Sequence, residues 1–170
     1  MDILKTNRLT LQQLTPSDAS FILGLLNEPS FHKYIGDKGV RKQKGALQYL
    51  RDGPIASYGN NGYGLYLVKE TISDSSIGIC GLKKREVLDI PDLGYAFLEK
   101  YWGQGYATEA GDAVLNYSRE ELKLARVAAI THPDNDSSIR VLRKLGFQFK
   151  KLVTLSGFDG PNKLFEIDLN

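Results

Sequence analysis

A glycine-rich turn at the start of a helix-like segment is the part of the sequence with the clearest chemical use. Residues 101–110 read YWGQGYATEA and follow a strand-like run. Free N–H groups at a helix N-terminus carry partial positive charge, and glycines let a bulky anion come close to the main chain. The pattern therefore indicates a cradle for phosphate, with glycines needed only for a tight turn as the alternative.

Two common nucleotide loops do not match this segment. A P-loop requires Gly-Lys followed by Ser or Thr, and no such triplet follows Gly105. The dinucleotide fingerprint requires a further glycine three residues after Gly105, where Thr108 stands. We therefore expect neither of these two nucleotide sites.

Covalent and metal chemistry have little support in the sequence. Cys80 stands in the strand-like run 76–82, which is typical of a small buried hydrophobe rather than of an acyl carrier. His32 and His132 have no recognisable catalytic setting, and we expect them to be structural or exposed. Two histidines do not make a convincing zinc site, so we expect no metal and no Cys/His hydrolase.

The elements before the glycine turn alternate between strand and helix patterns. Strands are predicted at residues 8–14, 63–68, 76–82 and 92–98. The strands at 63–68 and 76–82 indicate an antiparallel meander. A helix begins after Thr15, with Asp18 as its reciprocal cap, and ends at Glu28-Pro29. A second helical region at 41–58 is interrupted by Asp52-Gly53-Pro54, which should break or kink it.

A strand, helix and strand unit surrounds the glycine turn. The helix after Gly105 has a face of small residues that can pack closely on a sheet. The strand at 126–131 is nearly all apolar, as expected when both faces are covered and the pairing is parallel. A helix runs from the caps at 134–136 through Lys144, with Gly146 as its left-handed end. Strands are predicted at 147–155 and 163–169, which gives an α+β fold with a mixed sheet.

Composition and charge exclude several classes of protein. The chain has 170 residues, 42% hydrophobic and 25% charged, which indicates a single globular domain over residues 1–170. A net charge of +2 is too balanced for a nucleic-acid-binding surface. No stretch has the length of a membrane span, and the N-terminus lacks the apolar core of a signal peptide. With a single cysteine, the sequence predicts a cytoplasmic protein without nucleic-acid or membrane partners.

Three patterns stand in a fixed order along the chain. They are TNRL at residues 6–9 followed by Leu11, GYAFLEKYWGQGYATEA at 94–110, and NDSSIRVLRKLGF at 135–147. Their residue types and spacing resemble the GNAT superfamily of acyl-CoA-dependent N-acetyltransferases, especially its RimJ/RimL-like branch. The resemblance covers nearly the whole chain except residues 31–58. It implies a GNAT fold of about seven strands and about four helices, with a parallel pair and a bulge at the cofactor site.

The resemblance implies that acetyl-CoA is the acetyl donor. Its pyrophosphate is expected on the main-chain N–H groups of the glycine turn, and its pantetheine arm is expected to pair with the preceding strand. Trp102 departs from the Gln or Arg that the superfamily usually has three residues before Gly105, and is normal for the branch. The cofactor-binding residues implied are Phe97, Leu98, Gly103, Gln104, Gly105, Tyr106, Ala107, Thr108, Asn135, Ser138 and Arg143, with Arg140 also near the phosphates.

The resemblance further implies direct transfer to the acceptor without an acyl-enzyme. The developing oxyanion is expected on the main-chain N–H near Leu98. The superfamily's usual acid is a tyrosine whose matching position is Leu142, so this acid is absent. Ser138 is the nearest alternative in the branch's motif.

Carboxylates near the fourth predicted strand are candidates for the base. Asp92 is expected to take the proton of the acceptor amine, directly or through a water, with Glu99 as a second candidate. Tyr95 is expected to orient the acceptor. Glu86 and Asp89, with Asp92, would suit a cationic acceptor, or they are simply solvated.

The acceptor itself is left open by the sequence. The branch implies an amine such as the N-terminus of a ribosomal protein, while the same architecture serves polyamines, aminoglycosides and amino acids. A module that binds acyl-CoA without transferring the acyl group is the alternative class, supported by the missing tyrosine at Leu142. Homodimers are common in the branch, although no feature of this sequence requires one.

Overall fold

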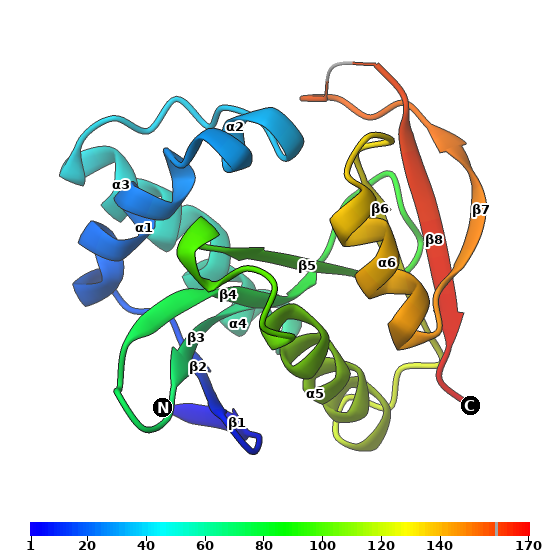
Figure 1. Ribbon diagram of the computed structural model, residues 1–170, viewed down its shortest axis with the longest axis horizontal. Helices are drawn as coiled ribbons and strands as arrows, with labels where there is room; N and C mark the ends of the chain where they lie inside the picture. Colours follow the sequence, from blue (N-terminus) through cyan, green and yellow to red (C-terminus); the bar gives the residue numbers. More distant parts are fainter. Residues whose placement is uncertain (159) are drawn as a thin grey trace.

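The computed structural model describes residues 1–158 and 160–170, which form one mixed sheet with helices against both faces (Figure 1). In these residues eight strands hydrogen-bond in the order β1-β2-β3-β4-β5-β6-β8-β7. The strands are β1 (Asp2–Lys5), β2 (Leu9–Gln13), β3 (Leu65–Glu70), β4 (Ser76–Lys83), β5 (Asp92–Phe97), β6 (Arg126–Thr131), β7 (Gln148–Val153) and β8 (Asn162–Asp168). The helices are α1 (Ala19–Leu26), α2 (Pro29–Tyr34), α3 (Gln43–Leu50), α4 (Ala56–Asn61), α5 (Tyr106–Glu120) and α6 (Asp136–Leu145). The predicted α+β class and mixed sheet are confirmed.

The first half of the sheet is the predicted antiparallel meander with one additional strand. β2, β3, β4 and β5 pair antiparallel in sequence order. β1 pairs antiparallel with β2 and brings the sheet to one strand more than the expected number of about seven. Ile3 and Leu4 are adjacent apolar residues, and both are half-buried. This short strand therefore lacks the alternation of apolar and polar residues that would have predicted it.

The first helix begins at the predicted caps, and the proline that ends it begins another. The Thr15 N–H donates to Asp18 Oδ2 at 2.8 Å, which completes the reciprocal cap. Pro29 was expected only to terminate this helix, but it also opens α2, which was not predicted. Proline suits the first position of a helix because that position needs no N–H donor.

The predicted helical region at 41–58 contains two helices. α3 and α4 are joined by a π-helical turn at Arg51–Ile55 that holds Pro54. The proline therefore interrupts the regular α-helix without ending the helical path. Tyr58, on α4, donates its hydroxyl to the Leu65 carbonyl and so ties this region to β3.

β5 and β6 are the predicted parallel pair around α5, and they meet at one point only. The register contains the single pair Asp92 with Ala128, beside a bond from the Ala128 N–H to the Pro91 carbonyl at 2.9 Å. No second pair joins the two strands in the described chain. The bulge predicted in β5 is absent from its pairing with β4, which keeps a regular register from Asp92 through Phe97. The two strands therefore separate without it.

The last third of the chain closes the sheet and carries α6. β6, β8 and β7 pair antiparallel. Asn135 caps α6 by accepting from the Ser138 N–H at 3.2 Å, and Gly146 takes a left-handed φ of 100°, both as predicted. Among the residues described, no helix is long and apolar enough to cross a membrane.

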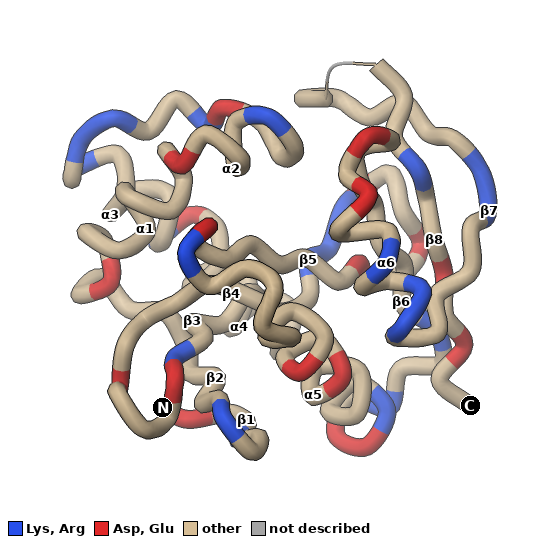
Figure 2. Tube along the Cα trace, viewed as in Figure 1, with Lys and Arg blue, Asp and Glu red and all other residues tan. Residues whose placement is uncertain are grey.

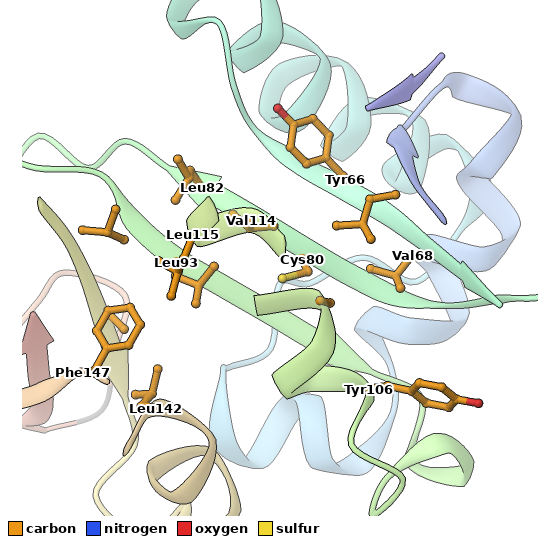
Figure 3. Packing of buried hydrophobic residues seen from close by; sticks show 14 of the residues in the cluster. Tyr66, Val68, Cys80, Leu82, Leu93, Tyr106, Val114, Leu115, Leu142 and Phe147 are labelled. Carbon is orange, nitrogen blue, oxygen red and sulfur yellow. The ribbon is translucent and has the colours of Figure 1, made fainter. Parts of the chain in front are cut away.

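Two apolar cores lie on the two faces of the sheet. α5 and α6 cover one face, where Cys80 and Leu93 of the sheet lie in one core with Val114 and Leu142 of the helices (Figure 3). Residues of α1, α2 and α3 form the second core with other residues of β3 and β4. Because successive residues of a strand point to opposite faces, each face of β5 belongs to a different helical layer.

Gly81 and Gly94 face each other across β4 and β5 and give a matched test of this packing. A Cβ on Gly81 would lie 2.1 Å from the Gly64 carbonyl oxygen and 2.8 Å from Leu65 Cα, whereas one on Gly94 would meet no heavy atom nearer than 3.5 Å. We expect Gly81→Ala to lower the free energy of unfolding by about 2 kcal/mol. Gly94→Ala should change it by less than about 0.5 kcal/mol. Urea unfolding followed by circular dichroism measures both, and equal effects would contradict the close approach of β3 and β4.

Candidate active site

A cavity of about 400 Å³ lies beside the unpaired stretch of β5. Its walls come from α2, from β5, from the turn that leads into α5, and from the segment that runs from the end of β6 through α6. Apolar side chains dominate the walls, with a few polar groups among them, as is typical of ligand sites of this volume. The cavity therefore brings together segments from both halves of the chain.

The glycine turn presents unpaired N–H groups to this cavity. Gly103 and Gly105 both have left-handed backbones, with φ of 77° and 83°, which a residue with a Cβ rarely adopts. Gly105 is the N-cap of α5, and no side chain caps the helix. The first turn therefore leaves the N–H groups of Tyr106, Ala107 and Thr108 without intrahelical acceptors. These three residues line the cavity, as both glycines do.

Gln104 does not line this cavity among the residues described, and its expected contact with the cofactor stays a prediction. It is exposed and lies outside the cavity walls formed by the described residues. Its carbonyl accepts from Arg8 Nη1 at 2.9 Å. Gln104 therefore helps to hold the turn through its main-chain carbonyl.

A group that the sequence reasoning missed fastens the turn to the start of the chain. Glu109 accepts from the Arg8 side chain through Nε at 2.8 Å, from the Arg8 N–H at 3.0 Å, and from the Thr6 hydroxyl at 2.5 Å. The Arg8 guanidinium also lies 4.3 Å from the ring centroid of Tyr106. The TNRL motif therefore holds the first turn of α5 in place, a role that the spacing of the motif did not reveal.

Trp102 holds the other side of the same turn. Its indole Nε1 donates to the Phe97 carbonyl at 2.9 Å, although the ring itself is 44% exposed. The bond links the residue before Gly103 to the last residue of β5. Trp102 thus fixes the angle between the strand and the glycine turn.

The hydrogen bonds of β5 decide which of its amides face the cavity. The Leu98 N–H donates to the Ile77 carbonyl at 3.0 Å, so it points toward β4. In an antiparallel pair these bonds alternate along the strand, so the N–H groups of Phe97 and Tyr95 point the other way, toward β6. The prediction that Leu98 supplies the oxyanion donor is therefore wrong. Phe97 and Tyr95 are the residues with main-chain donors on the cavity side.

Leu98 also fails as a partner for the pantetheine arm. Its carbonyl accepts from the Tyr101 N–H at 2.9 Å, and Leu98 does not line the cavity among the residues described. The expected contact near Phe97 and Leu98 is thus restricted to Phe97. A shift of one residue along a strand reverses the direction of its main-chain groups, which no side-chain pattern can reveal.

Tyr95 and Ser138 form a hydroxyl pair between β5 and α6. The two side-chain oxygens lie 2.7 Å apart, and the Tyr95 hydroxyl also donates to the Ser138 carbonyl at 3.3 Å. Burial raises the pKa of Tyr95 above its usual 10.0. Asn135 lies next to this pair as the cap of α6, and Leu142 is buried in the core beneath. The structure therefore brings a tyrosine to this region from β5 and not from α6.

The face of α6 that lines the cavity excludes Arg143. Arg140 and Lys144, one turn apart, line the cavity together with Ser137. Arg143 is exposed and lies outside the cavity walls of the described chain. Residues 140 and 143 differ by about 60° around a helix, enough to separate their directions here. The expected contact of Arg143 with the cofactor stays a prediction, and Arg140 is the arginine on the cavity side of the helix.

Asp92 is buried in the cavity wall, not exposed at a strand edge. It is 2% exposed and accepts from Arg85 Nε at 3.1 Å. Burial raises the pKa of Asp92, while the charges of Arg85 and Lys83 act in the opposite direction. Figure 2 shows both basic and acidic segments on the connection between β4 and β5, where Arg85 lies. Asp92 thus belongs to a charged group at the point where β5 and β6 meet.

The remaining candidates have structural partners. Glu99 accepts from the Ser30 N–H at 3.1 Å and does not line the cavity in the described chain. His132 does line it, and its Nδ1 accepts from the Asp134 N–H at 3.0 Å. Cys80 is fully buried, and burial raises the pKa of its thiol. Within residues 1–158 and 160–170, no three His, Cys, Asp or Glu residues are grouped to hold a metal ion.

The bonds to Glu109 predict a pH-dependent contribution to stability. Burial alone would raise the pKa of Glu109, but the bonds from Thr6 and Arg8 outweigh it and lower the pKa below its usual 4.5. A lowered carboxyl pKa stabilises the fold above the unfolded value and loses this contribution as the pH falls. We expect Glu109→Gln to lower the free energy of unfolding by about 1 kcal/mol at pH 7. The difference from wild type should shrink below pH 4.5.

Glu120→Gln is the matched control, because among the described residues Glu120 of the same helix pairs with exposed Arg119 alone. It should change the free energy of unfolding by less than about 0.5 kcal/mol at either pH. Chemical denaturation at pH 7 and pH 3.5 measures both variants. A deficit in Glu109→Gln that stays constant with pH would contradict the assigned bonds.

Comparison with known proteins identifies the family of the chain. Residues 8–148 match the family described as acetyltransferase (GNAT) domain. The Bacillus licheniformis protein named uncharacterized N-acetyltransferase p20 is 30% identical over 157 residues, which cover 90% of this chain and 86% of that protein. The Bacillus subtilis protein named uncharacterized N-acetyltransferase YoaA is 28% identical over 150 residues, or 86% of this chain and 82% of that protein.

Solved structures share the fold. An acetyltransferase of the GNAT family from Bacillus anthracis has a TM-score of 0.82 at 23% identity, with 99% of both chains covered. RimL, named as a ribosomal L7/L12 alpha-N-protein acetyltransferase and solved in complex with coenzyme A, has a TM-score of 0.85 at 18% identity, covering 99% of this chain and 98% of RimL. Because the family model matches most of the length of this chain, the chain belongs to the acetyltransferase (GNAT) domain family and is an acyltransferase of that family.

Proposed function

We propose that the protein transfers the acetyl group of acetyl-CoA to a primary amine by direct attack. The observation that carries this proposal is the unpaired edge of β5 beside the uncapped N-terminus of α5, both in the wall of one cavity. An extended arm can pair with an open strand edge, and a pyrophosphate suits a helix N-terminus. The RimL structure, which contains coenzyme A, has the same fold.

The glycine turn fits the pyrophosphate of this donor. The N–H groups of Tyr106, Ala107 and Thr108 supply hydrogen-bond donors without any charged side chain. A Cβ on Gly103 would meet no heavy atom within 4 Å, so the approach to the main chain is open on that side. Arg140 extends from α6 into the same cavity and adds positive charge for the phosphates.

The edge of β5 then sets the direction of the pantetheine arm. The arm runs from the glycine turn toward the pair Asp92 and Ala128, which closes the gap between the strands. The Phe97 N–H is the first donor along this path and the Tyr95 N–H is the second. We assign Phe97 to the arm and the Tyr95 N–H to the oxyanion that develops on the acetyl carbonyl.

The hydroxyl pair of Tyr95 and Ser138 is the proposed acid. The amine nitrogen forms a bond to the acetyl carbon, the carbon–sulfur bond breaks, and its electron pair leaves on sulfur. The thiolate takes a proton from the hydroxyl pair, whose oxygens lie 2.7 Å apart. This pair replaces the tyrosine that is absent at Leu142, and it supports an active enzyme over a module that only binds acyl-CoA.

Asp92 is the proposed base, and it acts through water. It lies three positions before Tyr95 in β5, which is roughly 10 Å along a strand. A carboxylate at that distance cannot reach the attacking amine directly. Its burial favours proton uptake, because burial raises the pKa of this carboxyl. The acceptor class remains a primary amine, either the N-terminus of a protein or a small molecule, in the cytoplasm.

The hydroxyl pair gives the first test of this mechanism. We expect Tyr95→Phe and Ser138→Ala each to lower kcat by about 10- to 100-fold, with little change in the KM for acetyl-CoA. The double variant should lose no more than the stronger single variant, because the two hydroxyls act as one unit. Release of free coenzyme A thiol measures the rate, and buried Cys80 does not contribute to the signal. Independent, multiplicative losses would contradict a shared proton path.

The cavity face of α6 gives a second test, directed at the donor. We expect Arg140→Met to raise the KM for acetyl-CoA by about 3- to 10-fold, as loss of one exposed contact to phosphate would. Arg143→Met, on the same helix and outside the cavity, is the matched control and should leave this KM unchanged. Steady-state kinetics at fixed ionic strength distinguish them. An equal effect of both variants would indicate only general attraction by the helix.

A further inference from the structure

The end of the cavity near the meeting point of β5 and β6 contains a group of basic residues that the transfer of an acetyl group does not require. We call Lys38, Lys83 and Arg85 the cation cluster, and all three line the cavity. Lys83 is the register partner of Asp92 across β4 and β5, and Arg85 follows on the connection between these strands. Lys38 comes from the loop between α2 and α3. Figure 2 shows basic segments on both this loop and the β4–β5 connection.

The cation cluster has more positive charge than its described neighbours neutralise. Asp92 pairs with Arg85 at 3.1 Å. Among residues 1–158 and 160–170, no carboxylate lies within 4.0 Å of the ammonium group of Lys38 or of Lys83. Burial, followed by the charges of Arg85 and Lys38, lowers the pKa of Lys83 to about 8. Holding such cations together in a cavity wall is unfavourable unless an anion binds there.

The position of the cluster separates it from the reacting atoms. Arg85 and Lys83 of the cluster lie beside Asp92, which is roughly 10 Å from Tyr95 along β5. The phosphates of the donor have their own site at the glycine turn, beyond the opposite end of β5. The cluster therefore faces neither the phosphates nor the thioester. The part of the substrates left for the cluster to bind is the end of the acceptor distant from its amine.

An aromatic ring beside the cluster helps to orient Arg85 for binding a planar or tetrahedral anion. The Arg85 guanidinium lies 5.5 Å from the ring centroid of Phe158. This contact and the ion pair with Asp92 together restrain the Arg85 side chain. Arginine held in one orientation presents its remaining N–H groups as a fork for two oxygen atoms. Glu86 and Asp89, which suggested a cationic acceptor in the sequence, are exposed and do not line the cavity among the residues described.

We propose that the acceptor is a small amine that also carries an anionic group, a carboxylate or a phosphonate, which binds to Lys38, Lys83 and Arg85. This inference rests on the proposed acetyl transfer and names the substrate class of the same cavity. The amine reaches the thioester while the anionic group binds at the cluster. Polyamines and aminoglycosides carry only positive charge, and the cluster repels them.

Matched pairs of amines test the proposal. Butylamine is compared with 4-aminobutyrate, hexylamine with 6-aminohexanoate, and ethylamine with 2-aminoethylphosphonate, so that the members of each pair differ in the anionic group. Thiol release with acetyl-CoA gives kcat/KM for each, and calorimetry with the protein saturated with coenzyme A gives their affinities. We expect the anionic member of at least one pair to bind and react at least about 10-fold better, as a charge-assisted hydrogen bond provides. The carboxylate and phosphonate pairs distinguish the two anions.

Variants then assign the preference to the cluster. Lys83→Met and Lys38→Met keep the length of the side chain, remove its charge and leave the Arg85–Asp92 pair in place. Each should reduce the preference for the anionic member by about 10-fold and leave the KM for acetyl-CoA unchanged. Lys84→Met is the matched control, because Lys84 is exposed and does not line the cavity in the described chain.

The outcomes separate this inference from the proposed function. Equal or weaker affinity for the anionic members in all pairs overturns the inference, whatever their turnover. So does a preference that survives both lysine variants, or best turnover of peptide N-termini without regard to acidic groups. In those cases acetyl-CoA binding and acceptor-dependent thiol release still support the acetyltransferase. Absence of acetyl-CoA binding overturns the proposed function itself, while the calorimetric comparison on the free protein still tests the anion site.

Discussion

The separation of β5 from β6 is the constraint on which the site depends. In the described part of the chain the strands share one matched pair, Asp92 and Ala128, and beyond it no register pair joins β5 to β6. Exposed edges of this kind bind strands or extended ligands. α5 and α6, which pack on one face of the sheet, contact each other where Leu145 lies 2.8 Å from the position of a Cβ on Gly111. The glycine lets the helices approach, so the unpaired edge is bordered by closely packed helices.

The alternation of side chains along β5 divides the work between the two faces of the sheet. Tyr95 points toward α6, where it meets Ser138, whereas Asp92 belongs to the register of Lys83 and the connection that carries Arg85. The main-chain donors lie in the plane of the sheet between these faces. In the proposed function, the donor binds against α5, α6 and the glycine turn. The acceptor then lies against α2, the loop before α3 and the β4–β5 connection.

The sequence predicted the meander, the parallel pair, the caps of α6 and the glycine turn, because each has a local pattern of side chains. It did not reveal which amide of β5 faces the cavity. For this purpose the difference between Leu98 and Phe97 is the direction of their N–H groups. That direction depends on the pairing of Leu98 with Ile77, which is distant in sequence. The tie between Arg8 and Glu109 and the approach of Lys38 to Lys83 and Arg85 are likewise long-range. β1 and α2 were missed because a short edge strand and a proline-initiated helix carry weak signals.

A crystal structure of the protein with coenzyme A shows whether the open edge of β5 and the first turn of α5 form one continuous site for the donor. We expect hydrogen bonds from the pantetheine arm to the main chain of β5 on its β6 side, with the pyrophosphate on the N–H groups of residues 106–108. A coenzyme bound outside the gap, or β5 and β6 joined in a continuous ladder with the arm excluded, would contradict this expectation.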